Sequence, residues 1–327
     1  MLLMSAVAIL VGFALLVWGA DRFVFGASGI ARKLGVSPLI IGLTIVGFGT
    51  SAPEMLVSGM AAFDGNPGLG VGNALGSNIA NIGLVIGATA LVTPLLVQSN
   101  VLRREFPVLI GVMLLVLVLI WDGMLGRFDG IVLLSGMFIL IGIMIKVARS
   151  SRADGIDPLE SEFEMEVPPA TEDSKPILWF IVGLLVLLGS SKMLVWGAVN
   201  VAQAFGVSDL VIGLTIVAIG TSLPELAASI MGALKNEHDI AIGNIIGSNM
   251  FNLLAVLAMP GLIAPSELSS DVFSRDYPVM FVLTIALLLM AYGFRGPGKI
   301  NRFEGGVLLA AYFSYMGWLY VAEVGNG

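Results

Sequence analysis

The sequence contains no cysteine and only one histidine, His238. The absence of cysteine excludes disulfide bonds, thiolate metal sites and cysteine nucleophiles. Charged residues are also scarce: they make up 12% of the 327 residues, compared with about 25% in soluble domains. Hydrophobic residues make up 57%. This composition excludes an ordinary soluble domain and predicts a protein that crosses the membrane several times.

The amino-terminal stretch MLLMSAVAILVGFALLVWGA has no basic residue before its apolar core and no clear small-residue cleavage site. We therefore expect it to be the first membrane span and not a removable signal peptide. The 41 glycines favour close packing between transmembrane helices. Acidic residues concentrate in 154–173, so most of the net charge of -7 belongs to one loop, which we expect to be solvated and disordered.

Apolar runs long enough to cross a bilayer, about 20 residues each, predict ten transmembrane helices. The expected ranges are 2–28, 38–62, 70–94, 106–121, 128–147, 177–200, 209–233, 240–264, 277–294 and 304–323. The hydrophilic stretch between the fifth and sixth is acidic and contains prolines. We therefore predict an all-α integral membrane protein with a five-helix unit at 1–147, a linker at 148–176 and a second five-helix unit at 177–327.

Lysine and arginine are distributed unevenly over the predicted loops. If the amino terminus lies outside, twelve of them fall in inside loops and two, Arg127 and Arg275, fall in outside loops. Because short cytoplasmic loops retain positive charge, we expect a protein of the inner cell membrane with both termini outside and the acidic linker in the cytoplasm. Asp21 and Lys192, within the first and sixth spans, are expected to extend toward the membrane surface.

The two halves of the chain are copies of each other. At an offset of 171, GVSPLIIGLTIVGFGTSAPE (35–54) matches GVSDLVIGLTIVAIGTSLPE (206–225), and VGNALGSNIAN (71–81) matches IGNIIGSNMFN (242–252). Further on, GRFDG matches NRFEG at an offset of 175. Because each copy has an odd number of helices, the second must enter the membrane in the opposite orientation. Inverted repeats of this kind are typical of secondary transporters that work by alternating access.

A polar segment, GTSAPE, lies within the second predicted helix. Thr50 and Ser51 are within one helical turn of Glu54, so three oxygen-bearing side chains converge. Pro53 has no amide hydrogen, which frees the carbonyl group of Gly49 four residues earlier. Burying a glutamate in a membrane costs about 2.5 kcal/mol or more, so a functional role is the default expectation. Serine and threonine alone would more often be packing residues.

A second polar segment, GSNIAN, places Ser77 and Asn81 on one helix face. The other copy repeats both segments, with matching side chains at Thr221, Ser222, Glu225, Ser248 and Asn252. Carboxylate, hydroxyl and amide oxygens without histidine or cysteine form a site for a hard cation such as calcium or sodium. Competition between these ions for shared ligands would couple their exchange. His238 lies in the charged loop KNEHD and is expected to be solvated.

These motifs resemble those of the calcium/cation antiporter superfamily, specifically its prokaryotic sodium/calcium exchangers, whose two alpha-repeats carry GTS-x-PE followed by G-N-x-x-G-S-N. The resemblance covers both repeats, here 42–81 and 213–252, and all ten predicted helices. It implies that the second, third, seventh and eighth helices form a compact core and that the first and sixth slide across it as gates. It also implies the following ion ligands: Thr50, Ser51, Glu54, Ser77, Asn81, Thr221, Ser222, Glu225 and Ser248, with backbone carbonyl groups near Gly47 and Ala218.

Asn252 completes the expected ligand set, but some relatives, including potassium-dependent exchangers, have an aspartate at this position. An amide is a weaker, neutral ligand that releases no proton, so the resemblance does not extend to potassium co-transport. The linker is also too short for the separate regulatory domain of animal exchangers.

We predict an antiporter, not an enzyme, that exchanges sodium for calcium and extrudes calcium electrogenically. Its expected partners are calcium, sodium and the lipid bilayer, with no resident cofactor, no catalytic residue, no nucleic acid and a monomeric transport unit. Three alternatives stay open at this level: coupling to protons in place of sodium, a passive cation channel, and an intramembrane hydrolase. The hydrolase would need its two glutamates to differ in proton affinity, yet their flanking residues are nearly identical.

Overall fold

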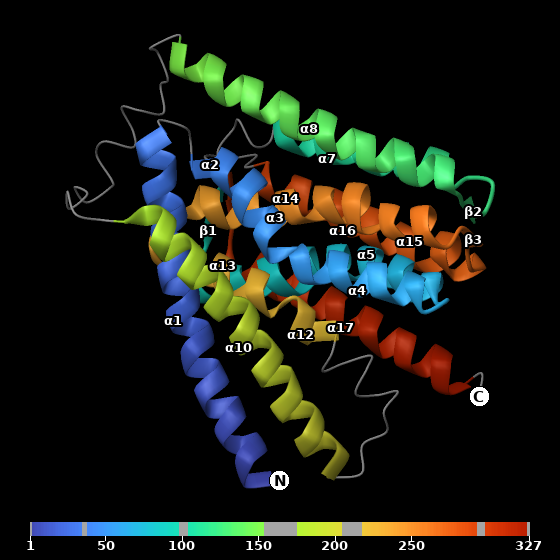
Figure 1. Ribbon diagram of the computed structural model, residues 1–327, viewed down its shortest axis with the longest axis horizontal. Helices are drawn as coiled ribbons and strands as arrows, with labels where there is room; N and C mark the ends of the chain where they lie inside the picture. The colour runs from blue at the N-terminus through green and yellow to red at the C-terminus, as the bar shows by residue number, and fades with distance from the viewer. Residues whose placement is uncertain are drawn as a thin grey trace.

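The computed structural model describes residues 2–34, 38–97, 104–153, 175–204, 218–292 and 298–325. The described chain is a bundle of helices with four very short strands (Figure 1). All ten predicted spans are present in it, at least in part. Within the described ranges, six helical segments are long and apolar enough to cross a membrane by themselves. Three expectations fall outside the described residues: the start of the seventh span (209–217), the end of the ninth (293–294) and most of the acidic linker (154–174).

The spans follow one another with several internal breaks. In chain order they are α1 (Leu2–Leu34); α2, η1, α3 and α4 (Pro38–Ile41, Gly42–Val46, Gly47–Thr50, Ala52–Phe63); α5, η2 and α6 (Pro67–Ala80, Asn81–Ile86, Gly87–Val92); α7 (Phe106–Leu119); α8 (Arg127–Ala153); α10 (Pro176–Ala204); α12 and α13 (Ala218–Thr221, Leu223–Leu234); α14, η5 and α15 (His238–Phe251, Asn252–Val256, Ala258–Ile263); η6 and α16 (Val272–Asp276, Tyr277–Ala291); and α17 (Arg302–Gly325). The segments labelled η are π-helical turns.

Two small antiparallel sheets make the inversion of the repeats visible. β1 (Leu95–Val97) pairs with β4 (Gly298–Ile300), and β2 (Met124–Leu125) pairs with β3 (Ser266–Glu267). In the repeat alignment β3 is the counterpart of β1, and β2 is the counterpart of β4. In each sheet, therefore, the first strand of one copy pairs with the second strand of the other copy. The sheets lie at opposite ends of the bundle, as an inverted repeat requires (Figure 1).

The third and eighth spans form the interior of the bundle. The segment His238–Ile263 is buried along its membrane window and Pro67–Val92 is largely buried, whereas α1, α8 and α10 are mostly exposed on their surfaces. The two copies cross closely here: a Cβ atom on Gly247 of α14 would collide with the Leu43 backbone of η1. Glycine is therefore required where the halves meet.

Helices α1 and α10 form a tightly packed antiparallel pair, which we call the α1–α10 pair. They run side by side at a steep angle to the interior helices (Figure 1). Glycines recur every seventh residue along the contact face of α1, at Gly12, Gly19 and Gly26. A Cβ atom on Gly19 would lie 3.1 Å from the Leu187 amide nitrogen, and one on Gly26 would lie 2.7 Å from the Pro176 carbonyl oxygen. Such backbone contact indicates that the pair behaves as one unit.

Two polar links join the α1–α10 pair to the loop between α13 and α14. The Asp21 carboxylate lies 2.8 Å from the Lys235 ammonium nitrogen. The Ser28 hydroxyl donates a hydrogen bond to the Glu237 carboxylate, which also pairs with Arg32 at 3.7 Å. Asp21, which we expected to extend toward the membrane surface, thus pairs with a lysine from a loop far along the chain.

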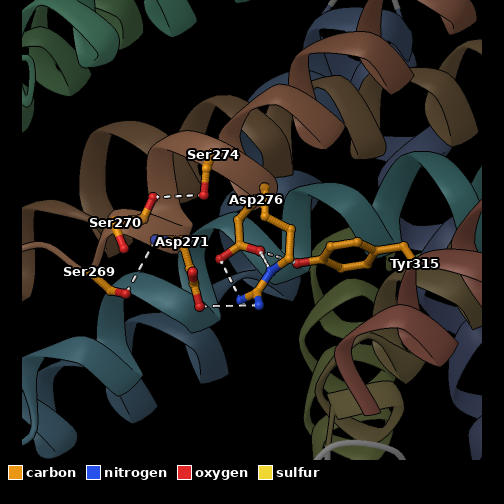
Figure 2. A network of polar contacts seen from close by, with 7 residues as sticks. Ser269, Ser270, Asp271, Ser274, Asp276 and Tyr315 are labelled. Carbon is orange, nitrogen blue, oxygen red and sulfur yellow. Dashed lines mark hydrogen bonds and ion pairs between the residues drawn. The ribbon is translucent and has the colours of Figure 1, made fainter. Parts of the chain in front are cut away.

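A charged cluster holds η6 against α17 at the end of the bundle that carries β2 and β3. Arg275 pairs with Asp276 at 2.7 Å and with Asp271 at 3.2 Å. The Tyr315 hydroxyl of α17 donates a hydrogen bond to Asp276 at 2.9 Å (Figure 2). Both charges of the closer pair are mostly buried, with 13% and 16% of their side chains exposed. The cluster therefore fixes the start of α16.

Candidate functional site

The two GTS-x-PE segments interrupt their helices at the same place. In the first copy α3 ends at Thr50 and α4 begins at Ala52, and Ser51 between them has φ -83° and ψ 1°. In the second copy Ser222 has φ -89° and ψ 2° between α12 and α13. The expectation of a continuous helix over 38–62 is therefore wrong at this point, because the proline that follows cannot continue the hydrogen-bond ladder. Broken helices of this kind build ion sites in inverted-repeat transporters.

The two GSN segments end in π-helical turns. Asn81 opens η2 and Asn252 opens η5, so both copies change their hydrogen-bond pattern at the matched asparagine. π-Helical turns inside α-helices are rare and are concentrated at functional sites. No sequence motif indicates this change in pitch, which places the two asparagines at equivalent positions of their helices.

The glutamates of both copies are buried at the centre. Glu54 and Glu225 are each 1% exposed. Asn244, which lies 3.5 Å from the Glu225 carbonyl oxygen, also accepts a hydrogen bond from Thr50, one helical turn before Glu54. Most of the other expected ligand side chains are also buried, namely Thr50, Ser51, Ser77, Asn81, Ser222, Ser248 and Asn252. Thr221 is only partly buried, and Ala218 is the first residue of α12. The bundle thus brings two like charges together in its interior, which only a compensating charge makes favourable.

Direct contacts join the expected ligands of opposite copies. The hydroxyl oxygens of Thr50 and Ser248 lie 3.3 Å apart. The Ser248 hydroxyl also lies 3.4 Å from the Gly47 carbonyl oxygen, which the resemblance had implied as a backbone ligand. Side chains 198 residues apart in sequence therefore converge on one point.

Several buried oxygen atoms of the site have no hydrogen-bond partner among the described residues. They belong to Ser51, Glu54, Asn81, Ser222, Glu225 and Asn252, and all six residues are in the ligand set expected from sequence. Buried oxygens without partners are costly, so they need a compensating group. The donor chemistry of carboxylate, hydroxyl and amide oxygens fits a hard cation.

Two asparagines outside the ligand set expected from sequence contact the backbone of the glutamates. The Asn73 amide group donates to the Glu54 carbonyl oxygen at 3.1 Å and to the Ser58 hydroxyl at 3.0 Å. In the second copy, Asn244 lies 3.5 Å from the Glu225 carbonyl oxygen and 3.2 Å from the Ser229 hydroxyl. These side chains hold the backbone that carries each glutamate.

Asn244 also links the two copies. Its amide oxygen accepts a hydrogen bond from the Thr50 hydroxyl at 3.0 Å, and it is fully buried, whereas Asn73 is only partly buried. The signal that could have identified both residues was present in sequence, because GN stands at matched positions four residues before Ser77 and Ser248. Spacing alone, however, does not show that Asn244 reaches across to Thr50.

A second asparagine cluster joins α5 to α14. Asn81 donates to the Asn249 amide oxygen at 3.0 Å, and Asn78 donates to the Asn249 carbonyl oxygen at 3.2 Å. Asn78 and Asn249 are matched positions in the two copies. The cluster therefore locks the crossing of the third and eighth spans next to Asn81.

The arrangement suits cation binding better than proton-transfer chemistry. Within the described ranges, no group of three or more histidine, cysteine, aspartate and glutamate side chains could hold a metal ion by itself, so a cation bound here needs the neutral oxygens as well. Charge in the site comes from two glutamates, and neutral oxygens surround them. Both glutamates are buried, and each has an asparagine and a serine beside its backbone, whereas an acid–base pair needs clearly different surroundings for its two members.

Comparison with known proteins gives a consistent result over nearly the whole chain. A family profile described as sodium/calcium exchanger protein matches residues 4–146 and 175–321. A protein named CaxA from Alkalimonas amylolytica is 51% identical over 98% of this chain and 99% of its own. The sodium/calcium exchanger MaX1 of Methanosarcina acetivorans is 30% identical over 97% and 98%. A solved structure of the sodium-calcium exchanger NCX_Mj, soaked with sodium and strontium, matches with a TM-score of 0.80 and 32% identity over 97% and 99%.

Proposed function

Because this chain belongs to the sodium/calcium exchanger family, and is thus a multi-pass membrane antiporter of cations, we propose that it exchanges sodium for calcium by alternating access. The observation that carries the proposal is that Glu54 and Glu225 are both buried, and that oxygen atoms of these and the other expected ligands have no hydrogen-bond partner among the described residues. Two carboxylates balance the charge of one divalent cation, and the surrounding neutral oxygens complete its coordination.

We propose that the ligands divide by role. Glu54 and Glu225 supply the charge, and Thr50, Ser51, Ser77, Asn81, Thr221, Ser222, Ser248 and Asn252, with the carbonyl groups of Gly47 and Ala218, supply neutral oxygens. Sodium ions take the same oxygens in another distribution, so calcium and sodium cannot occupy the full set together. This competition is the physical basis of coupled exchange, and it is electrogenic when more than two sodium ions replace one calcium ion.

The proposed sidedness follows from the basic residues and agrees with the paired loops. β1 and β4 come from loops that are rich in lysine and arginine, and β2 and β3 come from the loops at the other end. We propose that the β1–β4 end faces the cytoplasm together with the linker at 148–176, and that both termini lie outside. The halves at 1–147 and 177–327 then form the two inverted units of one monomeric transporter in the inner membrane.

Calcium uptake into proteoliposomes tests this function. Vesicles loaded with sodium and diluted into sodium-free medium should accumulate radioactive calcium, and an inside-negative potential should change the rate if the exchange is electrogenic. Vesicles with equal sodium on both sides are the matched control and should take up little. Absence of uptake under the outward sodium gradient would contradict sodium coupling.

Proton coupling is the second candidate, because carboxylates can carry protons. A pH gradient imposed without sodium separates the two mechanisms. Uptake under the pH gradient alone would favour a proton-coupled exchanger, and uptake without any counter-ion would favour a passive channel. We expect neither. Inverted repeats favour alternating access over a passive channel, and both copies carry an asparagine, which releases no proton, at the matched positions 81 and 252.

A further inference from the structure

Ser191 of the α1–α10 pair contacts the broken seventh span directly. The Gly220 carbonyl group in α12 precedes Pro224 by four residues, so it has no amide partner in a helix. The Ser191 hydroxyl donates a hydrogen bond to it, with an oxygen–oxygen distance of 2.8 Å. Ser191 is 6% exposed. This bond is therefore a polar link between the α1–α10 pair and the helix that carries Thr221, next to the ion site.

The matched positions in the first copy lack this link. At the repeat offset, Ala20 stands in place of Ser191 and Gly49 stands in place of Gly220. Ala20 lines an apolar cavity of about 530 Å³ between α1, α10, α12 and α13. Gly49 instead faces α10: a Cβ atom added to Gly49 would lie 3.3 Å from Leu184 Cδ2. The two copies thus differ at these positions in both residue and contact.

This difference has a consequence for alternating access. In an inverted repeat, each copy takes up in the opposite state the arrangement that its partner shows in this one. In that opposite state α10 leaves Gly220, so the Ser191 bond breaks, and Ala20 has no hydroxyl with which to form a matching bond to Gly49. The bond therefore belongs to only one of the two states. We propose that Ser191 is a positioning residue that stabilises the access state described here over its opposite, an inference that rests on the proposed alternating-access function.

Sided transport measurements give the first test. One neutral hydrogen bond shifts a two-state population by about fivefold. Ser191→Ala should therefore change the ratio of the apparent calcium KM values at the two membrane faces by about fivefold, while Ser191→Thr, which keeps the hydroxyl, should retain the ratio. Ser190→Ala is the matched control, because Ser190 is also buried but its hydroxyl donates to the Leu187 carbonyl oxygen of its own helix at 3.0 Å. Equal ratios for Ser191→Ala and Ser190→Ala would overturn the proposal.

Chemical labelling gives a second readout that needs no transport. The chain has no cysteine, so Ala227→Cys places a single thiol on the wall of the cavity beneath the α1–α10 pair. Adding Ser191→Ala should speed the reaction of this thiol with N-ethylmaleimide severalfold, because the pair leaves α12 more often. Adding Ser190→Ala should not. Identical labelling rates would overturn the role of Ser191, whereas a failure of sodium-loaded vesicles to take up calcium would count against the proposed function alone.

Discussion

Glu54 and Glu225 lie at the centre of a set of polar side chains that comes in two copies. Each glutamate is held through its backbone by an asparagine that also bonds a serine. At the scale of single residues, different side chains therefore have the two roles that we propose: the carboxylates provide the charge, and Asn73 and Asn244 hold the backbone that carries them.

Glu54→Gln and Glu225→Gln should each abolish calcium uptake, because one remaining carboxylate cannot balance a divalent cation in a buried site. Both variants should still be extracted as folded protein, since glutamine keeps the size of the side chain and removes a buried charge. Uptake into sodium-loaded proteoliposomes measures the effect. Glu267→Gln, on exposed β3, is the control and should transport normally. Full uptake by either site variant would remove the carboxylates from the mechanism.

Asn244→Ala should raise the apparent KM for calcium more than Asn73→Ala. Loss of a side chain that orients metal ligands typically weakens affinity by about 10- to 100-fold. Asn244 is fully buried and also holds Thr50 of the other copy, whereas Asn73 stays within its own copy. Calcium dependence of uptake for the two variants checks the order. Equal effects would show that the contact across the copies does not contribute.

At the scale of elements, the α1–α10 pair is distinct from the rest of the bundle in how it is held together. Its contact face has glycine at every seventh position of α1 and brings backbone against backbone. In a membrane, where apolar surfaces gain little from meeting each other, such close packing is the main source of helix association. The pair is thus expected to move without separating.

Gly26→Val should destabilise the folded protein, because the added side chain would meet the backbone of α10 near Pro176. Overpacking of this kind costs roughly 1–3 kcal/mol, so the apparent unfolding temperature in detergent should fall by several degrees. Gly142→Val on α8 is the control, since nothing lies within 4 Å of the added Cβ atom. A fall of the same size in both variants would mean that the effect belongs to glycine in general and not to the pair.

At the scale of the whole molecule, the sequence was sufficient for the ten spans, the inverted repeat and the family, because these depend on apolar length and on matched motifs. The sequence did not predict the contacts that depend on how the two copies pack. Thr50 forms a hydrogen bond with Asn244, and Asp21 forms an ion pair with Lys235; in both pairs the residues are about 200 positions apart in sequence. The break at Ser51 was only half predicted: proline indicated a freed carbonyl group, and the structure ends the helix there.

The two copies are also less alike in the structure than in the alignment. Asn244 is buried where Asn73 is partly exposed, Thr50 is buried where Thr221 is not, and Ser191 bonds where Ala20 cannot. The proposed alternating access requires such a difference between the copies in any one state. Ligand sets that match in sequence are therefore expected to be unequal in geometry at any one moment.

The central claim is that calcium and sodium compete for one site built around Glu54 and Glu225. Binding of radioactive calcium to the purified protein, measured with increasing sodium, tests this claim most directly, with potassium at the same ionic strength as the control. We predict that sodium displaces calcium, that potassium does not, and that Glu54→Gln removes the calcium binding. Calcium binding that is indifferent to sodium, or that survives in Glu54→Gln, would contradict the account.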